Sequence, residues 1–183
     1  MVESDRDLVE RVRGGDRDAF GDLVRRYLRA AYAVALAGTG DPVDAEDVCQ
    51  DAFVVALERI DSLRDGGHFA AWLLRIVRNQ AHNRRRAERV RQAGPLAEAG
   101  GVAGPADTAR AAELSRVRER LLEALEGLPA RQREVLLLHD LDGWKHREIA
   151  EALGVPEGTI RAQLSYARRA VRRFLGVTSQ EEV

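Results

Sequence analysis

Residues 145–175 (KHREIAEALGVPEGTIRAQLSYARRAVRRFL) carry a row of basic side chains and contain no Asp or Glu between Gly158 and Gly176. Arginine neutralises nucleic-acid phosphates, and arginine, glutamine and hydroxyl side chains hydrogen-bond the edges of bases. This chemistry predicts contact with duplex DNA, although a helical hairpin with a solvated basic face would give the same pattern. The candidate contact residues are Thr159, Arg161, Gln163, Ser165, Arg168, Arg169 and Arg172.

A second acid-free cluster of arginines occupies residues 75–86, which hold five arginines. The polar side chains here lie off the helical stripe formed by Phe69, Trp72, Leu73, Ile76 and Val77, so we expect them to face outward. Such a face suits contact with DNA phosphates. The candidates are Arg75, Arg78, Asn79, His82, Asn83 and Arg86.

Residues 41–51 have the opposite character, with five acids and no base. Acids near a helix N-terminus favour the helix dipole, but one or two would suffice for that. The surplus predicts docking on a basic protein surface, with Asp44, Glu46, Asp47, Gln50 and Asp51 as candidates. The net charge of −1 therefore conceals separated patches of opposite sign.

Other classes of function lack their signatures in this chain. The four histidines are not spaced as metal ligands with Cys or carboxylates, and no nucleophile elbow, phosphate-binding loop or glycine fingerprint is present. We therefore expect no enzyme activity, no metal and no cofactor. A single cysteine, Cys49, fits a reducing, cytoplasmic setting. No apolar run approaches the length of about 18 residues that a membrane span needs, so no membrane insertion is expected.

The elements that must hold these side chains are predicted to be helices. Ala, Leu, Arg and Glu dominate, and strand-like alternation is missing, so the fold class is all-α. Ser4 or Asp5, then Asp16, then Asp41 before Pro42 are expected N-caps. The expected helices are a first one ending at Gly14, followed by 17–37, 42–60, 69–90, 108–126 and 130–139, and then two more within 145–175.

Helical spacing also predicts which side chains face the core. The expected inward residues include Leu28, Val55 and Leu57 in the first half, and Leu114, Val117, Leu121, Leu125 and Phe174 in the second. Within 145–175, Gly154 ends one helix, and Pro156 prevents its continuation. Thr159 is the expected cap of the next helix. This is the layout of a helix-turn-helix, whose second helix enters the major groove.

Residues 91–107 break the helical pattern. They are rich in Gly, Ala and Pro and lack periodicity, which is typical of a flexible linker. The predicted architecture is two helical domains, 1–90 and 108–183, joined by this linker, with the helix-turn-helix in the second domain.

Four motifs along the chain resemble those of bacterial RNA polymerase sigma factors. Residues 44–53 (DAEDVCQDAF) resemble the family's DAEDxxQxxF run, and 69–79 (FAAWLLRIVRN) with Arg84–Arg86 resemble its FRAWLxxIARN…RR helix. Residues 128–135 (LPARQREV) and 149–161 resemble the entry and the helix-turn-helix of its C-terminal domain. The order and the two-domain layout resemble the extracytoplasmic-function group of the sigma-70 family.

This resemblance implies a role for each patch. Residues 44–51 would dock on core RNA polymerase, against the β′ subunit, in an assembly that also includes β. Residues 69–86 and the loop 61–68 would open and read the minus-ten element of promoter DNA, with Arg78 and Asn79 as the foremost strand contacts. The helix 159–175 would read the minus-thirty-five element. An anti-sigma factor is a possible further partner.

The chain also departs from the family pattern. Ala162-Gln163 stands where Ser-Arg is usual, and Tyr166 where Arg is frequent. Asn83 replaces a usual Asp, and Ala70 a common Arg. Glutamine still pairs with adenine, so these changes bear on which bases are preferred. The alternative function is a helix-turn-helix regulator that does not act as a polymerase subunit.

Overall fold

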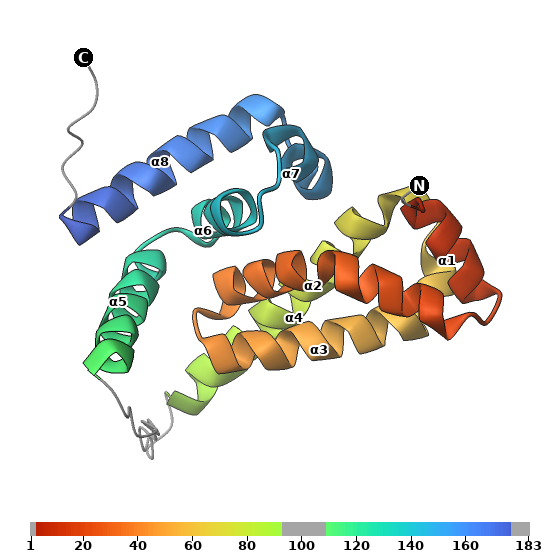
Figure 1. The fold of residues 1–183 in the computed structure, drawn as a ribbon, viewed down its shortest axis with the longest axis horizontal. Coiled ribbons are helices and arrows are strands. Elements are labelled where there is room, and N and C mark those ends of the chain that lie inside the picture. The colour runs from red at the N-terminus through yellow and green to blue at the C-terminus, as the bar shows by residue number, and fades with distance from the viewer. Residues whose placement is uncertain (1–2, 93–108, 177–183) are drawn as a thin grey trace.

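The computed structural model describes residues 3–92 and 109–176, and within these residues it contains helices and turns but no strand. The first half holds α1 (Asp5–Arg13), α2 (Arg17–Thr39), α3 (Pro42–Glu58), the 3-10 turns η1 (Ile60–Ser62) and η2 (Gly66–His68), and α4 (Phe69–Gln92). The second half holds α5 (Ala109–Glu126), α6 (Ala130–Leu136), the π turn η3 (Leu137–Leu141), α7 (His146–Leu153) and α8 (Glu157–Leu175). The all-α expectation is confirmed (Figure 1).

The first three helices begin where their capping residues predict. Ser4, rather than Asp5, caps α1 by accepting from the Asp7 amide. The Asp16 carboxylate accepts from two amides at the start of α2, and Asp41 does the same for α3, with Pro42 at the first helical position. Each carboxylate or hydroxyl satisfies amides that have no partner within the helix.

The long helix α2 is the centre of the first half, with α1, α3 and α4 packed around it. Small residues let these helices approach closely, since α2 buries Ala30, Ala31, Ala33 and Ala35 completely. One close approach is at Gly38, where a Cβ atom would lie only 2.6 Å from the Cβ of Ala81 in α4. The position of α4, and so of its arginines, therefore depends on this crossing.

In the second half, α6 packs against α8, and α8 also contacts α5 and α7. The guanidinium of Arg133 in α6 is buried and donates to the carbonyl oxygens of Glu126 and Leu128, at 3.3 and 3.2 Å. Burial lowers the pKa of Arg133, because the interior favours its neutral form. The arginine thereby joins the end of α5 to α6.

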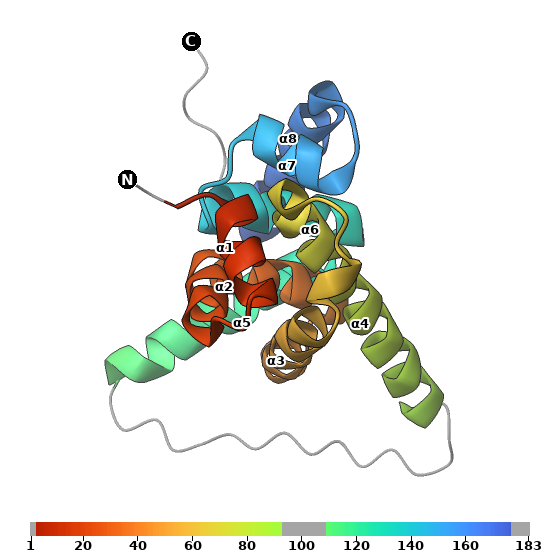
Figure 2. The same ribbon diagram turned by 90° about the vertical axis from the view of Figure 1, so that its right-hand side faces the viewer.

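The two halves pack against each other, with α6 and η3 on α2 and with α7 on α4. Figure 2 shows α7 and α8 above the first-half helices, while the last turns of α4 and the first turns of α5 extend away from the body. Buried apolar residues of both halves form one continuous core. Nearly all of the expected linker 91–107 lies outside the described residues.

Some expected inward residues are exposed. Leu28 and Leu57 lie on the outer sides of α2 and α3. Leu114 and Val117 are exposed because the first turns of α5 have no helix beside them. Leu121, which lines an open cavity next to α2 and α8, is exposed as well, so only Leu125 of that stripe is buried. Phe174 is exposed at the end of α8. Periodicity identifies an apolar side of a helix, but it does not identify how far along that side a neighbour extends.

Several helix boundaries also differ from expectation. Helices α2 and α4 end two residues later than expected, at Thr39 and Gln92, and α3 ends two residues earlier, at Glu58. Helix α8 begins at Glu157 after Pro156, without a side-chain cap, so Thr159 lies within its first turn. Helix α6 continues into the π turn η3, whose end at Leu141 is two residues beyond the expected one. Within residues 3–92 and 109–176, every helix is too short or too polar to cross a membrane.

Candidate nucleic-acid interface

The helix-turn-helix geometry is present in α7 and α8. Helix α7 ends at Gly154, which has a φ of 65° and so adopts the left-handed conformation that glycine tolerates. The Val155 amide then donates to the Ala150 carbonyl at 3.1 Å, and Pro156 leads into α8. Ile160, Leu164 and Ala167 are buried on the inner side of α8. This burial fixes which side of α8 faces outward.

The basic residues of α8 lie largely on that outer side. Thr159, Arg161, Ser165, Arg169 and Arg172 are exposed, and Gln163 and Arg168 are half-buried. Arg161 forms an ion pair with Glu157 one turn earlier, at 2.6 Å. The Arg169 guanidinium lies over the Tyr166 ring, 4.9 Å from its centre, a cation–π contact that holds the cation at the surface. The predicted face is therefore continuous and accessible.

Arg168 differs from its neighbours because it also joins α8 to the turn η3. Its guanidinium donates to both carboxylate oxygens of Asp140, one of them at 3.0 Å, and contacts His139 Nδ1 at 3.2 Å. The hydrogen bond to Asp140 raises the pKa of Arg168. Burial tends to raise the pKa of Asp140, but hydrogen bonds from Arg168 and His139 outweigh burial and lower it. Arg168 thus orients α8 as well as adding charge to it.

The predicted residues of α4 occupy one exposed side of that helix, with one exception. Arg75, Asn79, His82, Asn83 and Arg86 are exposed. Arg78 is only partly exposed, because it pairs with Glu134 of α6. On the apolar side Phe69, Leu73 and Val77 are fully buried, whereas Trp72 and Ile76 of the same stripe are only partly buried. The fold therefore presents the arginines outward, as the sequence predicts.

The loop before α4 is held in place by α1, a role that the sequence does not suggest. Asp65 accepts from the Gly67 amide and from the Arg6 guanidinium, each at 2.9 Å, and these bonds lower the pKa of Asp65. Arg13 donates to the carbonyl oxygens of Ile60 and Leu63. These contacts preorganise the loop next to the exposed side of α4.

The acidic residues of α3 share an outer face, and one arginine of α4 reaches them. Glu46, Asp47, Gln50 and Asp51 are exposed. Arg84 pairs with Asp44 at 2.7 Å and with Asp47 at 3.1 Å, and the hydrogen bond to Asp44 raises the Arg84 pKa. In the sequence Arg84 is one of three consecutive arginines, and nothing in that pattern predicts its position beside the acids.

Two cationic faces, on α4 and α8, and one acidic face, on α3, thus lie on one chain. Cationic helices suit the phosphate backbone of nucleic acid, and an acidic helix suits a basic protein surface. Among the described residues, no group of three or more His, Cys, Asp or Glu is placed to hold a metal ion.

Residues 23–91 match the family model described as Sigma-70 region 2, and residues 118–171 match the model described as Sigma-70, region 4. The chain belongs to the sigma-70 family. It is 34% identical over 185 aligned positions to the ECF RNA polymerase sigma-E factor of Escherichia coli K12, covering 92% of each chain. Such relatives assign it to the extracytoplasmic-function group.

It is also 34% identical to the probable RNA polymerase sigma factor RfaY of Xanthomonas campestris pv. campestris, over 88% of this chain. This chain spans only 41% of the length of RfaY. Among solved structures, CnrH in complex with the cytosolic domain of CnrY has a TM-score of 0.65 and 29% identity, covering 97% of this chain and 100% of CnrH. RpoE in complex with the anti-sigma factor NepR, from Bartonella quintana, has a TM-score of 0.64 and 28% identity, covering 87% and 98%.

Proposed function

We propose that this chain binds core RNA polymerase and directs it to promoters. Residues 1–90 and 108–183 would be two domains that perform different parts of this function. The observation that carries the proposal is the presence of two outward cationic faces and one acidic face on a member of the sigma-70 family. A regulator that only binds duplex DNA needs one cationic face. Like the polymerase it would serve, the chain would work in the cytoplasm.

The acidic face of α3 is the proposed contact with polymerase, on its β′ subunit. Glu46, Gln50 and Asp51 are exposed, and Arg84 neutralises only the part of the face nearest α4. Charge of this kind accelerates docking on a basic partner and orients it. Asp51 is the better residue to substitute in a test, because a change at Asp47 would also break its ion pair with Arg84 within the chain.

The side of α4 with Arg75, Asn79 and His82 is the proposed reader of the opened minus-ten strand. The arginines neutralise its phosphates, and the adjoining loop 61–68 provides the place for an extruded base. Since Asp65 fixes that loop by its bonds to Gly67 and Arg6, the pocket would be formed before DNA arrives.

Helix α8 is the proposed reader of the minus-thirty-five element in the major groove. The start of a recognition helix contacts base edges, and Thr159, Arg161 and Gln163 stand there. Gln163 suits adenine, and the arginines further along suit guanine or phosphate. Ala162 contributes no polar contact, so the preferred bases differ from those of relatives that carry Ser-Arg here.

An anti-sigma factor is the proposed regulatory partner. The solved relatives CnrH and RpoE are each bound to another protein, and the partner of RpoE, NepR, is an anti-sigma factor. In this chain a cavity of about 510 Å³ lies between α2, α5, η3 and α8, with Leu121 and Leu125 among its apolar walls and Arg118 and Arg172 among its cations. An apolar helix with acidic flanks would complement this cavity.

The test is reconstituted transcription with purified core polymerase. Asp51→Lys should weaken binding to core by about tenfold and leave promoter preference unchanged, because several charges share the contact. Asp22→Lys is the control, since Asp22 is an acid of α2 whose partner among the described residues is Arg25 of the same helix. If the wild-type chain bound duplex DNA but not core polymerase, it would be a regulator of the alternative class. If Asp51→Lys bound core normally, α3 would not be the docking face.

A further inference from the structure

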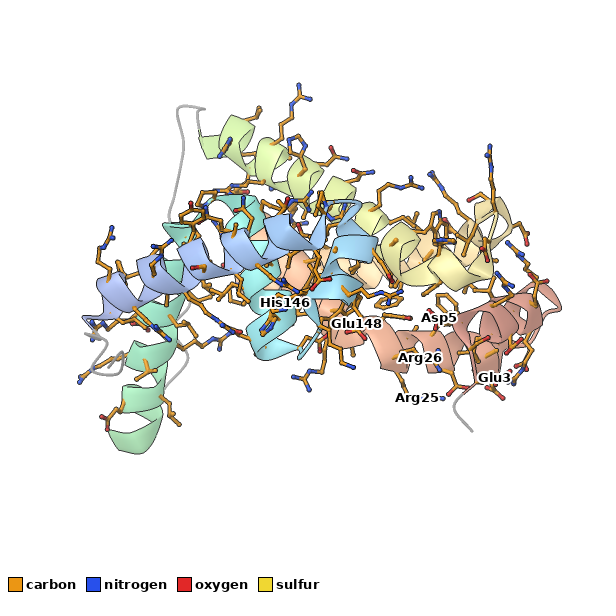
Figure 3. All side chains as sticks on the ribbon, turned by 90° about the horizontal axis from the view of Figure 1, so that it is seen from above. Glu3, Asp5, Arg25, Arg26, His146 and Glu148 are labelled. Carbon is orange, nitrogen blue, oxygen red and sulfur yellow. The ribbon has the colours of Figure 1, made fainter. Side chains whose placement is uncertain are left out.

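Ala162 and Tyr166 lie near the middle of the outer side of α8. With about 3.6 residues per turn, both fall on the side opposite the buried residues of this helix. Both are exposed, and the Tyr166 side chain is an exposed large hydrophobic group at 55%. In Figure 3, which views the molecule from above, none of the other described helices lies in front of α8. A DNA duplex that lay along this side would therefore contact both residues.

These two residues place an apolar spot in the middle of a polar face. Arg161, Gln163 and Ser165 around them carry groups that hydrogen-bond the edges of bases, whereas the Ala162 methyl group and the Tyr166 ring offer apolar surface. Long side chains of a helix lean toward its N-terminus, so the ring leans toward Ala162, one turn earlier. Among the groups that base pairs present in the major groove, the apolar one is the C5-methyl group of thymine.

The guanidinium of Arg169 holds the Tyr166 ring in place. It lies over the ring, 4.9 Å from the ring centre, one turn further along α8. This cation–π contact covers one face of the ring and restricts its rotation. A side chain that is already ordered loses less conformational entropy when it binds, so the ring is preorganised for a contact with a base.

We propose that Ala162 and Tyr166 form the contact for the C5-methyl group of one thymine in the major groove, and that Arg169 positions the Tyr166 ring for this contact. The proposal rests on the proposed function of α8 as the reader of duplex DNA, and it is independent of how α3 meets polymerase. It assigns an A·T pair to the base step that faces the middle of α8, next to the bases that Arg161 and Gln163 reach.

The test begins with a selection of duplex DNA by the full chain, both alone and bound to core polymerase, from a pool that is randomised in the minus-thirty-five region. Each thymine of the selected duplex is then replaced in turn by 2′-deoxyuridine, which lacks only the C5-methyl group. Affinity is read by the fluorescence anisotropy of the labelled duplex. We expect the replacement at one position to weaken binding about fourfold, which is the effect of one buried methyl group.

Substitutions in α8 assign this effect to its residues. Tyr166→Ser removes the ring and should bind the thymine and deoxyuridine duplexes equally, whereas Tyr166→Phe keeps the ring and should keep the fourfold ratio. Arg169→Gln releases the ring, so the ratio should fall to about twofold or less. The loss of a phosphate contact alone would weaken binding to both duplexes equally and leave the ratio unchanged. Phe174→Ser is the matched control, because Phe174 is an aromatic residue at the far end of α8 and is 49% exposed.

Each outcome decides one part of the proposal. If the wild type bound every deoxyuridine duplex as tightly as the thymine duplex, no methyl contact would exist. If the ratio persisted in Tyr166→Ser, a different residue would make the contact, and an unchanged ratio in Arg169→Gln would remove its positioning role. A chain that selected duplex DNA but did not bind core polymerase would lose the proposed function, while the ratio would still decide the thymine contact. A chain that selected no duplex in either state would refute α8 as a reader and the contact with it.

Discussion

At the crossing of α2 and α4, the tertiary structure decides whether the substitution Gly38→Ala stabilises or destabilises the protein. Gly38 lies inside α2, so helix propensity alone says that Gly38→Ala stabilises by about 0.5–1 kcal/mol. The new Cβ would, however, lie 2.6 Å from the Cβ of Ala81, whereas carbon atoms prefer separations of about 3.5–4.0 Å. The helices must move apart by about 1 Å, and overpacking of this kind costs about 1–3 kcal/mol. We expect Gly38→Ala to lower the free energy of unfolding by about 1 kcal/mol.

A compensating change makes the prediction specific. Ala81 is fully buried, so Ala81→Gly alone should cost about 1–2 kcal/mol through propensity and a lost methyl contact. In the double variant the methyl group moves from one helix to the other, and stability should return to within about 0.5 kcal/mol of the wild type. The coupling free energy of the cycle is then at least about 1 kcal/mol, as expected for residues in contact.

Urea unfolding followed by circular dichroism at 25 °C measures all four proteins. Gly21→Ala is the control, because it lies in the same helix and its Cβ would meet only the flexible end of Arg25, at 3.3 Å. That variant should be as stable as the wild type or more stable. If Gly38→Ala were stabilising, or if Ala81→Gly failed to rescue it, the close crossing would not set the position of α4.

Three further predictions concern single side chains. Because the pKa of Asp140 is lowered, its bond with Arg168 stabilises the fold above the ordinary carboxyl pKa of 3.8, and this stabilisation is lost as the pH falls through the lowered pKa. The difference in unfolding free energy between the wild type and Asp140→Asn should therefore be smaller at about pH 3 than at about pH 6. Burial raises the pKa of Cys49 to about 11, so its reaction with a disulfide reagent at neutral pH should be slow and should accelerate on adding denaturant. Asp41→Ala removes the cap of α3 and should lower the unfolding free energy by about 1 kcal/mol in chemical denaturation, whereas an unchanged value would show that the cap contributes nothing.

Local signals in the sequence identified most of the helices and most of the proposed DNA face. Caps such as Asp16 and Asp41 act within three residues of themselves, so they can be read without knowing the fold. Gly154 is equally local, because a left-handed residue ends a helix wherever the helix lies. The outward direction of the α8 arginines followed from its apolar spacing, since one side of a helix determines the other.

Side chains whose partners are distant in sequence could not be predicted in this way. The pairing of Arg78 with Glu134 spans 56 residues and that of Arg84 with Asp44 spans 40, and no periodicity carries such information. Leu114 and Val117 show the converse, since an apolar stripe predicts burial only if a neighbour is there to cover it. The sequence by itself determined which residues are cationic, acidic or apolar and which helix side they share. Only the tertiary structure decided that α7 lies against α4 and that Glu134 of α6 pairs with Arg78, because contact between distant segments depends on the packing of the whole chain.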